Sequence, residues 1–274
     1  ADAVVVIRAG HIESVGAGLK PPLGFPLLDL SSFTVLPGLI DLHVHLLDSP
    51  ETFGDPKRYL TRTPKQAMED GRRHARETLR AGFTTVRNLG TYEPWLDRRL
   101  RGEVDSGRVE GPRMQVAGYY LTTPGGGGDL SIAGVPSRLR RGTARGAEAF
   151  RRKADAALRE GADLLKVIAS GAVLAHGSEP GSPEMTREEI SAVVQAAHAA
   201  GKKGAAHAHG ARSGLDALAS GADTVEHASL IDAEGIAAAK QAGAALVMDV
   251  YNGDYIDREG RAAGWPADYL EKNL

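Results

Sequence analysis

One phrase recurs along this chain and limits the folds open to it: the tail of a helix, then a glycine, then a short apolar strand. It occurs at residues 79–86, 158–166, 199–205, 218–225 and 241–246. A glycine in the left-handed conformation commonly closes a helix, and repeated helix-then-strand units are typical of parallel strands with helical crossovers. Further strands at 35–45 and 116–118 bring the predicted number to seven. The pattern predicts an α/β fold, the (β/α)8 TIM barrel, with seven strands present here.

Polar residues recur at one depth in these strands, five or six positions after each glycine. They are Asn88, Lys166, His207, His227 and Asp249. In a parallel barrel this depth is the C-terminal rim, where active sites lie. Lys166 is the most informative, because it stands within the apolar run 164–168. A buried, unpaired lysine is costly, so it must lose its charge, find a partner or be chemically changed.

Pairs of histidines mark two of the strand ends. His43 and His45 are two residues apart, so on a strand they share one face, about 6–7 Å from each other. Two such imidazoles can hold one cation. His207 and His209 also share a face. The common depth favours His207 as a metal ligand and sets His209 further out, toward a substrate.

Composition excludes several classes of protein. The chain has 274 residues, a net charge of −2 and 25% charged residues, so it has no basic footprint for nucleic acid. It has no apolar run long enough to cross a bilayer. The absence of cysteine excludes disulfides and thiolate metal sites.

The N-terminal segment predicts short strands at 4–7 and 12–15 around a turn at 8–11. This is too little for an independent domain, so we expect part of a small β unit. The chain opens with Ala1, which is compatible with a removed leader or a trimmed start. The compartment therefore stays open between the cytoplasm and the periplasm or exterior.

These motifs together resemble the metal-dependent amidohydrolase superfamily. The resemblance rests on Pro-Gly-Leu-Ile-Asp-Leu-His-Val-His at 37–45, Lys166, His-Ala-His-Gly at 207–210 and Glu-His-Ala at 226–228. It covers the whole chain and is strongest to the branch with Xaa-Pro dipeptidases, ochratoxin-degrading aryl-amino-acid amidases and imidazolonepropionase-like proteins. It implies a distorted barrel over residues 35–274 and, over residues 1–34, the first strands of a small β-sandwich.

The resemblance also implies a site with two divalent metals at the barrel mouth. His43 and His45 would bind the first metal, His207 and His227 the second, and Lys166, carboxylated by carbon dioxide, would bridge both. The carbamate would remove the cost of burying a lysine, and neutral imidazoles suit zinc. A hydroxide shared by the two metals would then attack the scissile carbonyl.

Two departures from the family pattern stand out. The family places a metal-binding, acid/base aspartate after the eighth strand, and no matching aspartate or eighth strand is present. Asp249 belongs to the seventh strand and is no substitute. We therefore expect the natural chain to continue past Leu274, and weak or no turnover if it does not. The glycine-rich segment 123–129 predicts a flexible loop where several relatives have a histidine.

Three hypotheses follow for function. The first is a binuclear metallohydrolase of amide bonds that acts on Xaa-Pro-like dipeptides or on N-acyl or aryl amino acids. The second is a hydrolase of a cyclic amide, lactone or imidazolone, and the third is a truncated barrel without catalysis. Substrate contacts are predicted for His209, Tyr120, His176 and Arg212. We expect a small-molecule partner, no nucleic acid or membrane, and a homo-oligomer.

Overall fold

A computed structural model describes residues 3–273 of the chain, which divides into two compact units, Ala1–Gly38 and Leu39–Leu274. In the first unit, β1 (Ala3–Arg8) pairs antiparallel with β2 (His11–Ala17). Ala9 and Gly10 connect them with φ angles of 50° and 79°. A two-residue turn with both residues left-handed matches the twist of paired strands. The hairpin expected at residues 4–15 is therefore confirmed.

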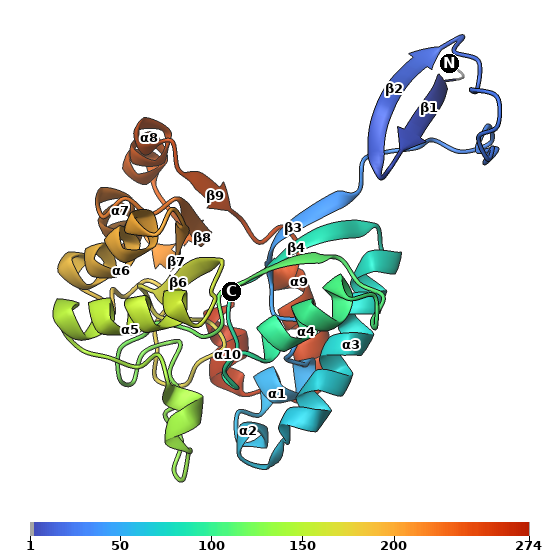
Figure 1. The fold of residues 1–274 in the computed structure, drawn as a ribbon. Coiled ribbons are helices and arrows are strands. Elements are labelled where there is room, and N and C mark those ends of the chain that lie inside the picture. Colours follow the sequence, from blue (N-terminus) through green and yellow to red (C-terminus); the bar gives the residue numbers. More distant parts are fainter. Residues whose placement is uncertain (1–2, 274) are drawn as a thin grey trace. The chain divides into compact units, whose positions relative to one another are not determined.

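In its described residues, the second unit contains seven parallel strands joined by helices, as expected (Figure 1). The strands are β3 (Leu39–Val44), β4 (Phe83–Asn88), β5 (Arg113–Val116), β6 (Leu164–Ile168), β7 (Lys203–Gly210), β8 (Thr224–Leu230) and β9 (Ala245–Val247). They form two sheets, β3-β4-β5 and β6-β7-β8-β9. A parallel bridge between Leu121 and Val167 links the segment after β5 to β6. This is the arrangement of a distorted TIM barrel.

Helices connect the successive strands of the second unit. The crossover helices are α3 (Pro64–Arg80), α4 (Leu96–Asp105), α5 (Ala147–Arg159), α6 (Arg187–Ala199), α7 (Ala211–Ala219) and α8 (Ala233–Ala242). Shorter helices are α1 (Pro50–Gly54), α2 (Arg58–Thr61), η1 (Ser137–Arg140), α9 (Asn252–Tyr255), η2 (Ile256–Gly260) and α10 (Ala267–Lys272). Helices α5, α6 and α7 follow one another along one side of the unit (Figure 1). Among the described residues, no helix has both the length and the apolar character needed to cross a membrane.

Local sequence explains where the helices begin and end. The side chain of Thr63 accepts a hydrogen bond from the amide of Gln66, which caps the first turn of α3. Gly82 follows the end of α3 with φ of 97°, and Gly161 follows α5 with φ of 100°. All five glycines of the recurring phrase have φ between 65° and 100°. Each turn then starts a strand at the same depth, which aligns the strand ends at one rim.

The main core lies between the sheet β6-β7-β8-β9 and the helices that cover it. Phe150 of α5, Val167 of β6 and Ile190 of α6 are fully buried in it. A smaller cluster under α3 and α4 includes Met68 and Leu100. These contacts hold the strands, and hence the rim, in place.

Phe150→Ala tests the contribution of this core. Removing a fully buried phenylalanine should lower the free energy of unfolding by about 3–5 kcal/mol, because apolar contacts are lost and a cavity is left. Phe33 is 71% exposed, so Phe33→Ala should change the free energy by no more than about 0.5 kcal/mol. Urea unfolding followed by circular dichroism measures both. Equal losses for the two variants would contradict this placement of the core.

Candidate metal centre

The strand ends bring four of the predicted ligands together. His43 lies at the end of β3, and the centre of its ring is 4.7 Å from that of His227 on β8. The ring of His207 on β7 lies 4.5 Å from that of His227. The rings of His43 and His45 are 5.2 Å apart. The imidazoles of three strands therefore form one cluster inside the rim.

The free nitrogens of His43 and His45 face each other. The Nδ1 of His43 lies 3.1 Å from a carboxylate oxygen of Glu226, and the Nδ1 of His45 lies 3.0 Å from the carbonyl of Gly90. Both oxygens only accept hydrogen bonds, which favours the tautomer with the proton on each Nδ1. The two Nε2 atoms are 3.3 Å apart, and each presents a lone pair. Such a contact is repulsive unless a proton or a cation lies between them.

In His207 and His227, too, one ring nitrogen forms a hydrogen bond and the other is left free. The Nε2 of His207 donates to the carbonyl of Gly171 at 3.1 Å, which leaves Nδ1 free. The Nδ1 of His227 donates to Asp249, which leaves Nε2 free. His227 has a φ of 67°, a left-handed conformation that costs energy in a residue other than glycine. Strain of this kind is often found at functional sites.

His209 lies in the same cluster. One nitrogen each of His207, His209 and His227 lie within 4.8 Å of one another, close enough to hold a metal ion. The ring of His209 stacks on His227 at 4.6 Å, and its Nδ1 lies 3.0 Å from the hydroxyl of Ser229. Both members of the predicted His207/His209 pair thus face the cluster.

Lys166 lies beside these imidazoles. It is 1% exposed, and within residues 3–273 no carboxylate lies within ion-pair distance of its nitrogen. Burial lowers its pKa to about 8, while Glu226 acts to raise it and Arg87 to lower it further. Burial and Lys166 together lower the pKa of His43 well below its usual value and that of His45 to about 4. His43 and His45 are therefore neutral at pH 7, the form that binds metals.

The spacing of the donors fits a zinc ion. Two nitrogens that each lie about 2.0–2.1 Å from a tetrahedral zinc ion are about 3.3–3.4 Å apart. The distance between the Nε2 atoms of His43 and His45 is 3.3 Å. The set offers neutral imidazoles and no thiolate, which suits zinc and related divalent ions. The residues present therefore fit a divalent metal.

The comparison with known families decides the assignment. The model of the amidohydrolase family matches residues 34–274. The chain belongs to the amidohydrolase family. This confirms the resemblance, and structures of relatives confirm the barrel.

The chain is similar to an ochratoxinase and to two prolidase-type structures. The ochratoxinase of Aspergillus niger is 28% identical over 252 residues, which are 85% of this chain and 52% of that protein. A Xaa-Pro dipeptidase structure with bound methionine has a TM-score of 0.84 and 27% identity, and the match covers 99% of this chain and 68% of that one. A prolidase in complex with N-methylphosphonate-L-proline has a TM-score of 0.87 and 29% identity over 98% of this chain and 66% of that one.

A partial match points to another branch of the family. The dihydroorotase of Geobacter metallireducens is 43% identical over 95 residues, 35% of this chain and 19% of that protein. This amidohydrolase chain spans about half the length of the curated relatives that it matches along most of its length.

The residues predicted to contact substrate separate into two groups. Tyr120 lies in the site, with its hydroxyl 3.2 Å from the Nδ1 of His45, and His209 lies in the imidazole cluster. His176 instead lies 2.9 Å from Asp268 of α10 and is half exposed. Arg212 is 73% exposed and bonds Asp216 along α7. The structure therefore does not bring Arg212 to the cluster.

The glycine-rich segment after β5 differs from the expected flexible loop. A Cβ atom on Gly127 would lie 2.8 Å from the Cβ of Ala172, and one on Gly128 would lie 2.6 Å from a side-chain carbon of Ile168. The amide of Gly127 donates to Glu184 at 2.7 Å. The glycines allow close packing against the segment after β6.

Sequence reasoning missed Glu226 and Arg87 as members of the site. Glu226 is fully buried and Arg87 is 6% exposed. The available signal was weaker than for Lys166: each is a charged residue within a predicted strand, but polar residues accompany Arg87 in β4 and Glu226 in β8. Asn88, which did attract attention, has a structural role, since its side-chain oxygen accepts from the amide of Leu46 at 2.9 Å.

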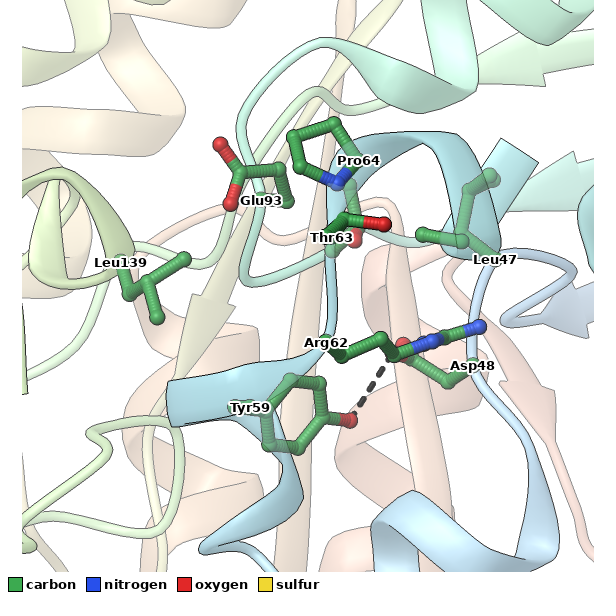
Figure 2. A pocket seen from close by; sticks show the side chains of 10 residues that line it. Leu47, Asp48, Tyr59, Arg62, Thr63, Pro64, Glu93 and Leu139 are labelled. Carbon is green, nitrogen blue, oxygen red and sulfur yellow. Dashed lines mark hydrogen bonds and ion pairs between the residues drawn. The ribbon is translucent and has the colours of Figure 1, made fainter.

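A second feature of the rim is a small cavity beside Asp48. Its volume is about 20 Å³, room for one water-sized group. Figure 2 shows the hydroxyl of Tyr59 pointing at the Asp48 carboxylate, at 2.8 Å. The other carboxylate oxygen is buried without a partner in the described part of the chain. Contacts between aromatic rings lead from Tyr59 through Tyr92 and Tyr120 to His45, with centroids 4.8, 5.0 and 5.6 Å apart.

Asp48 predicts a pH dependence of stability. Burial raises its pKa to about 6 from the usual 3.8. Between these values the folded chain holds a proton that the unfolded chain releases, so Asp48 reduces stability as the pH rises through this window. Asp48→Asn cannot titrate and still accepts from Tyr59. The variant should be more stable than wild type at pH 7, by up to about 3 kcal/mol, with little difference near pH 4.

Asp216→Asn provides the matched control, because the pKa of Asp216 is lowered. Burial alone would raise it, but hydrogen bonds from Arg212 and Arg187 outweigh burial. This variant should lose stability at pH 7. Urea unfolding at pH 4, 5, 6 and 7 measures both variants, and a loss of stability in Asp48→Asn at pH 7 would contradict the assignment.

Proposed function

We propose that this chain forms the metal-binding barrel of a hydrolase that cleaves amide bonds in dipeptides of the Xaa-Pro type or in N-acyl or aryl amino acids. The observation that carries the proposal is the pair of Nε2 atoms of His43 and His45, which face each other at 3.3 Å. Their geometry suits a tetrahedral divalent ion. The ochratoxinase and Xaa-Pro dipeptidase relatives support the class of substrate.

We assign the first metal to His43 and His45 and the second to His207 and His227. When bound, such a pair of ions supplies an activated water and polarises the scissile carbonyl. The imidazoles bind through the nitrogens left free by their other hydrogen bonds. The carbonyl of Gly90 orients His45, and we assign Tyr120, whose hydroxyl lies beside His45, to contact with the substrate.

Lys166 is assigned as the bridge in its carboxylated form. Only a neutral amine reacts with carbon dioxide, and a lysine with a pKa of about 8 is partly neutral near pH 7–8. The nitrogen bonds to the carbon of carbon dioxide and releases one proton, which leaves a carbamate anion. This change converts a buried cation into an anion with two oxygens for metals, and so removes the cost of burying the lysine.

The second candidate function is hydrolysis of a cyclic amide, lactone or imidazolone in the same site. The partial likeness to the dihydroorotase supports it. A panel of acyl-proline, acyl-phenylalanine and ring substrates separates the two candidates. Cleavage of the acyl amino acids is expected, and cleavage of ring substrates alone would favour the second.

Lys166→Ala tests the metal centre. Wild type grown with zinc and bicarbonate should hold about two zinc ions per chain, and the variant about one or fewer, because the bridge is lost. Short carboxylic acids such as formate or acetate should restore part of the zinc. The content is measured by plasma emission spectrometry after gel filtration.

Lys203→Ala is the control for this experiment. Lys203 also lies on a barrel strand, but it is exposed and pairs with Asp223, so its removal should leave the zinc content unchanged. Full zinc content in Lys166→Ala without added acid would contradict the bridging role of Lys166. A wild type that binds no zinc or other divalent metal would contradict the proposed metal centre.

A further inference from the structure

A buried carboxylate outside the ligand set lies directly behind His43. Glu226 on β8 is fully buried, and one of its oxygens lies 3.1 Å from the Nδ1 of His43. Its other oxygen accepts hydrogen bonds from Arg87, at 2.7 Å, and from the hydroxyl of Thr224. We propose that Glu226, held by Arg87, is a positioning residue that fixes His43 as the tautomer whose Nε2 is free for metal.

Arg87 on β4 binds this carboxylate on β8. Its Nε donates to the carbonyl of Leu42 at 2.6 Å, and its Nη1 lies 3.2 Å from the hydroxyl of Thr224. Leu42 immediately precedes His43 on β3, and Thr224 begins β8. One guanidinium on β4 therefore connects the backbone of the ligand strand to the carboxylate that faces the ligand. The two opposite charges also compensate each other, as buried ions require.

The carboxylate decides between two states of His43. With its proton on Nε2, His43 could donate a hydrogen bond to the Nε2 of His45, 3.3 Å away, and both nitrogens would then be satisfied. That state has no lone pair on His43 for a metal. A carboxylate beside Nδ1 accepts only, so it favours the proton on Nδ1 and leaves Nε2 free. Glu226 thus disfavours a hydrogen bond between His43 and His45 that would occupy both Nε2 lone pairs.

Glu226→Gln reverses this preference with little change in shape. The side of residue 226 that meets Arg87 and Thr224 is surrounded by hydrogen-bond donors, so the amide oxygen must face them. The amide nitrogen then faces Nδ1 of His43 and donates to it. A donor at this position favours the proton on Nε2, the tautomer that cannot bind metal.

The test combines two measurements. Nitrogen-15 NMR of histidine-labelled chain, with His43→Gln used to assign its signals, should find the proton of His43 on Nδ1 in metal-free wild type and on Nε2 in Glu226→Gln. Competition with a chelator should find zinc bound roughly 10–100-fold more weakly by the variant, the usual loss when a partner behind a ligand is removed. A role in stability alone would lower the melting temperature and move neither readout.

Asp216→Asn is the matched control for the affinity measurement. Asp216 is also a buried carboxylate held by arginines, but within residues 3–273 it bonds Arg187 and Arg212 and no histidine. Its replacement should leave zinc affinity within twofold of wild type. A similar loss of affinity in this control would show that the effect is not specific to Glu226 and would overturn the inference.

The inference rests on the proposed metal centre, and the two can fail separately. A wild type that binds no zinc contradicts the proposed metal centre. The tautomer of His43 then still tests whether Glu226 positions the proton on Nδ1. Normal zinc binding in wild type, with unchanged affinity and tautomer in Glu226→Gln, overturns the inference and leaves the metal centre standing. Should the variant not fold, a proton on Nε2 of His43 in metal-free wild type overturns the inference without it.

Discussion

The site depends on one constraint: polar groups inside a barrel must have their hydrogen bonds satisfied, and here each imidazole is satisfied on one side only. Carbonyl and carboxylate oxygens hold the outer nitrogens of His43, His45 and His207. The inner nitrogens are left as lone pairs, and those of His43 and His45 face each other at 3.3 Å. Neutral imidazoles without protons between them repel, and a cation removes the repulsion. The proposed metal centre follows from this arrangement, because a bound cation would relieve the repulsion between these donors.

The barrel supplies this arrangement through the alignment of its strands. Left-handed glycines end the helices at equivalent positions, so residues five or six places later arrive at the same rim. β6, β7 and β8 place Lys166, His207 and His227 there, in parallel register. The left-handed φ of His227 costs backbone energy at this rim, and the glycine-rich loop packs closely against the segment after β6.

Much of the fold and of the candidate site could be predicted, because both depend on local patterns with a fixed period. The helix–glycine–strand phrase indicated the crossovers, and alternation along a strand put His43 and His45 on one face. Contacts made by long side chains could not be predicted in the same way. His176 and Arg212 follow strands that end at the rim, yet their nitrogens bond Asp268 and Asp216. Sequence position limits where a backbone lies but not which carboxylate a flexible side chain will meet.

The sequence by itself determined the order of helices and strands, the depth of the polar residues and the anomaly of a lysine in a buried strand. Only the tertiary structure decided which nitrogen of each histidine is free, because that depends on oxygens far along the chain. Glu226 is 183 residues from His43, and Gly90 is 45 residues from His45. A periodic pattern carries information about neighbours within a turn or a strand, whereas the proton on an imidazole responds to whatever the fold places against it.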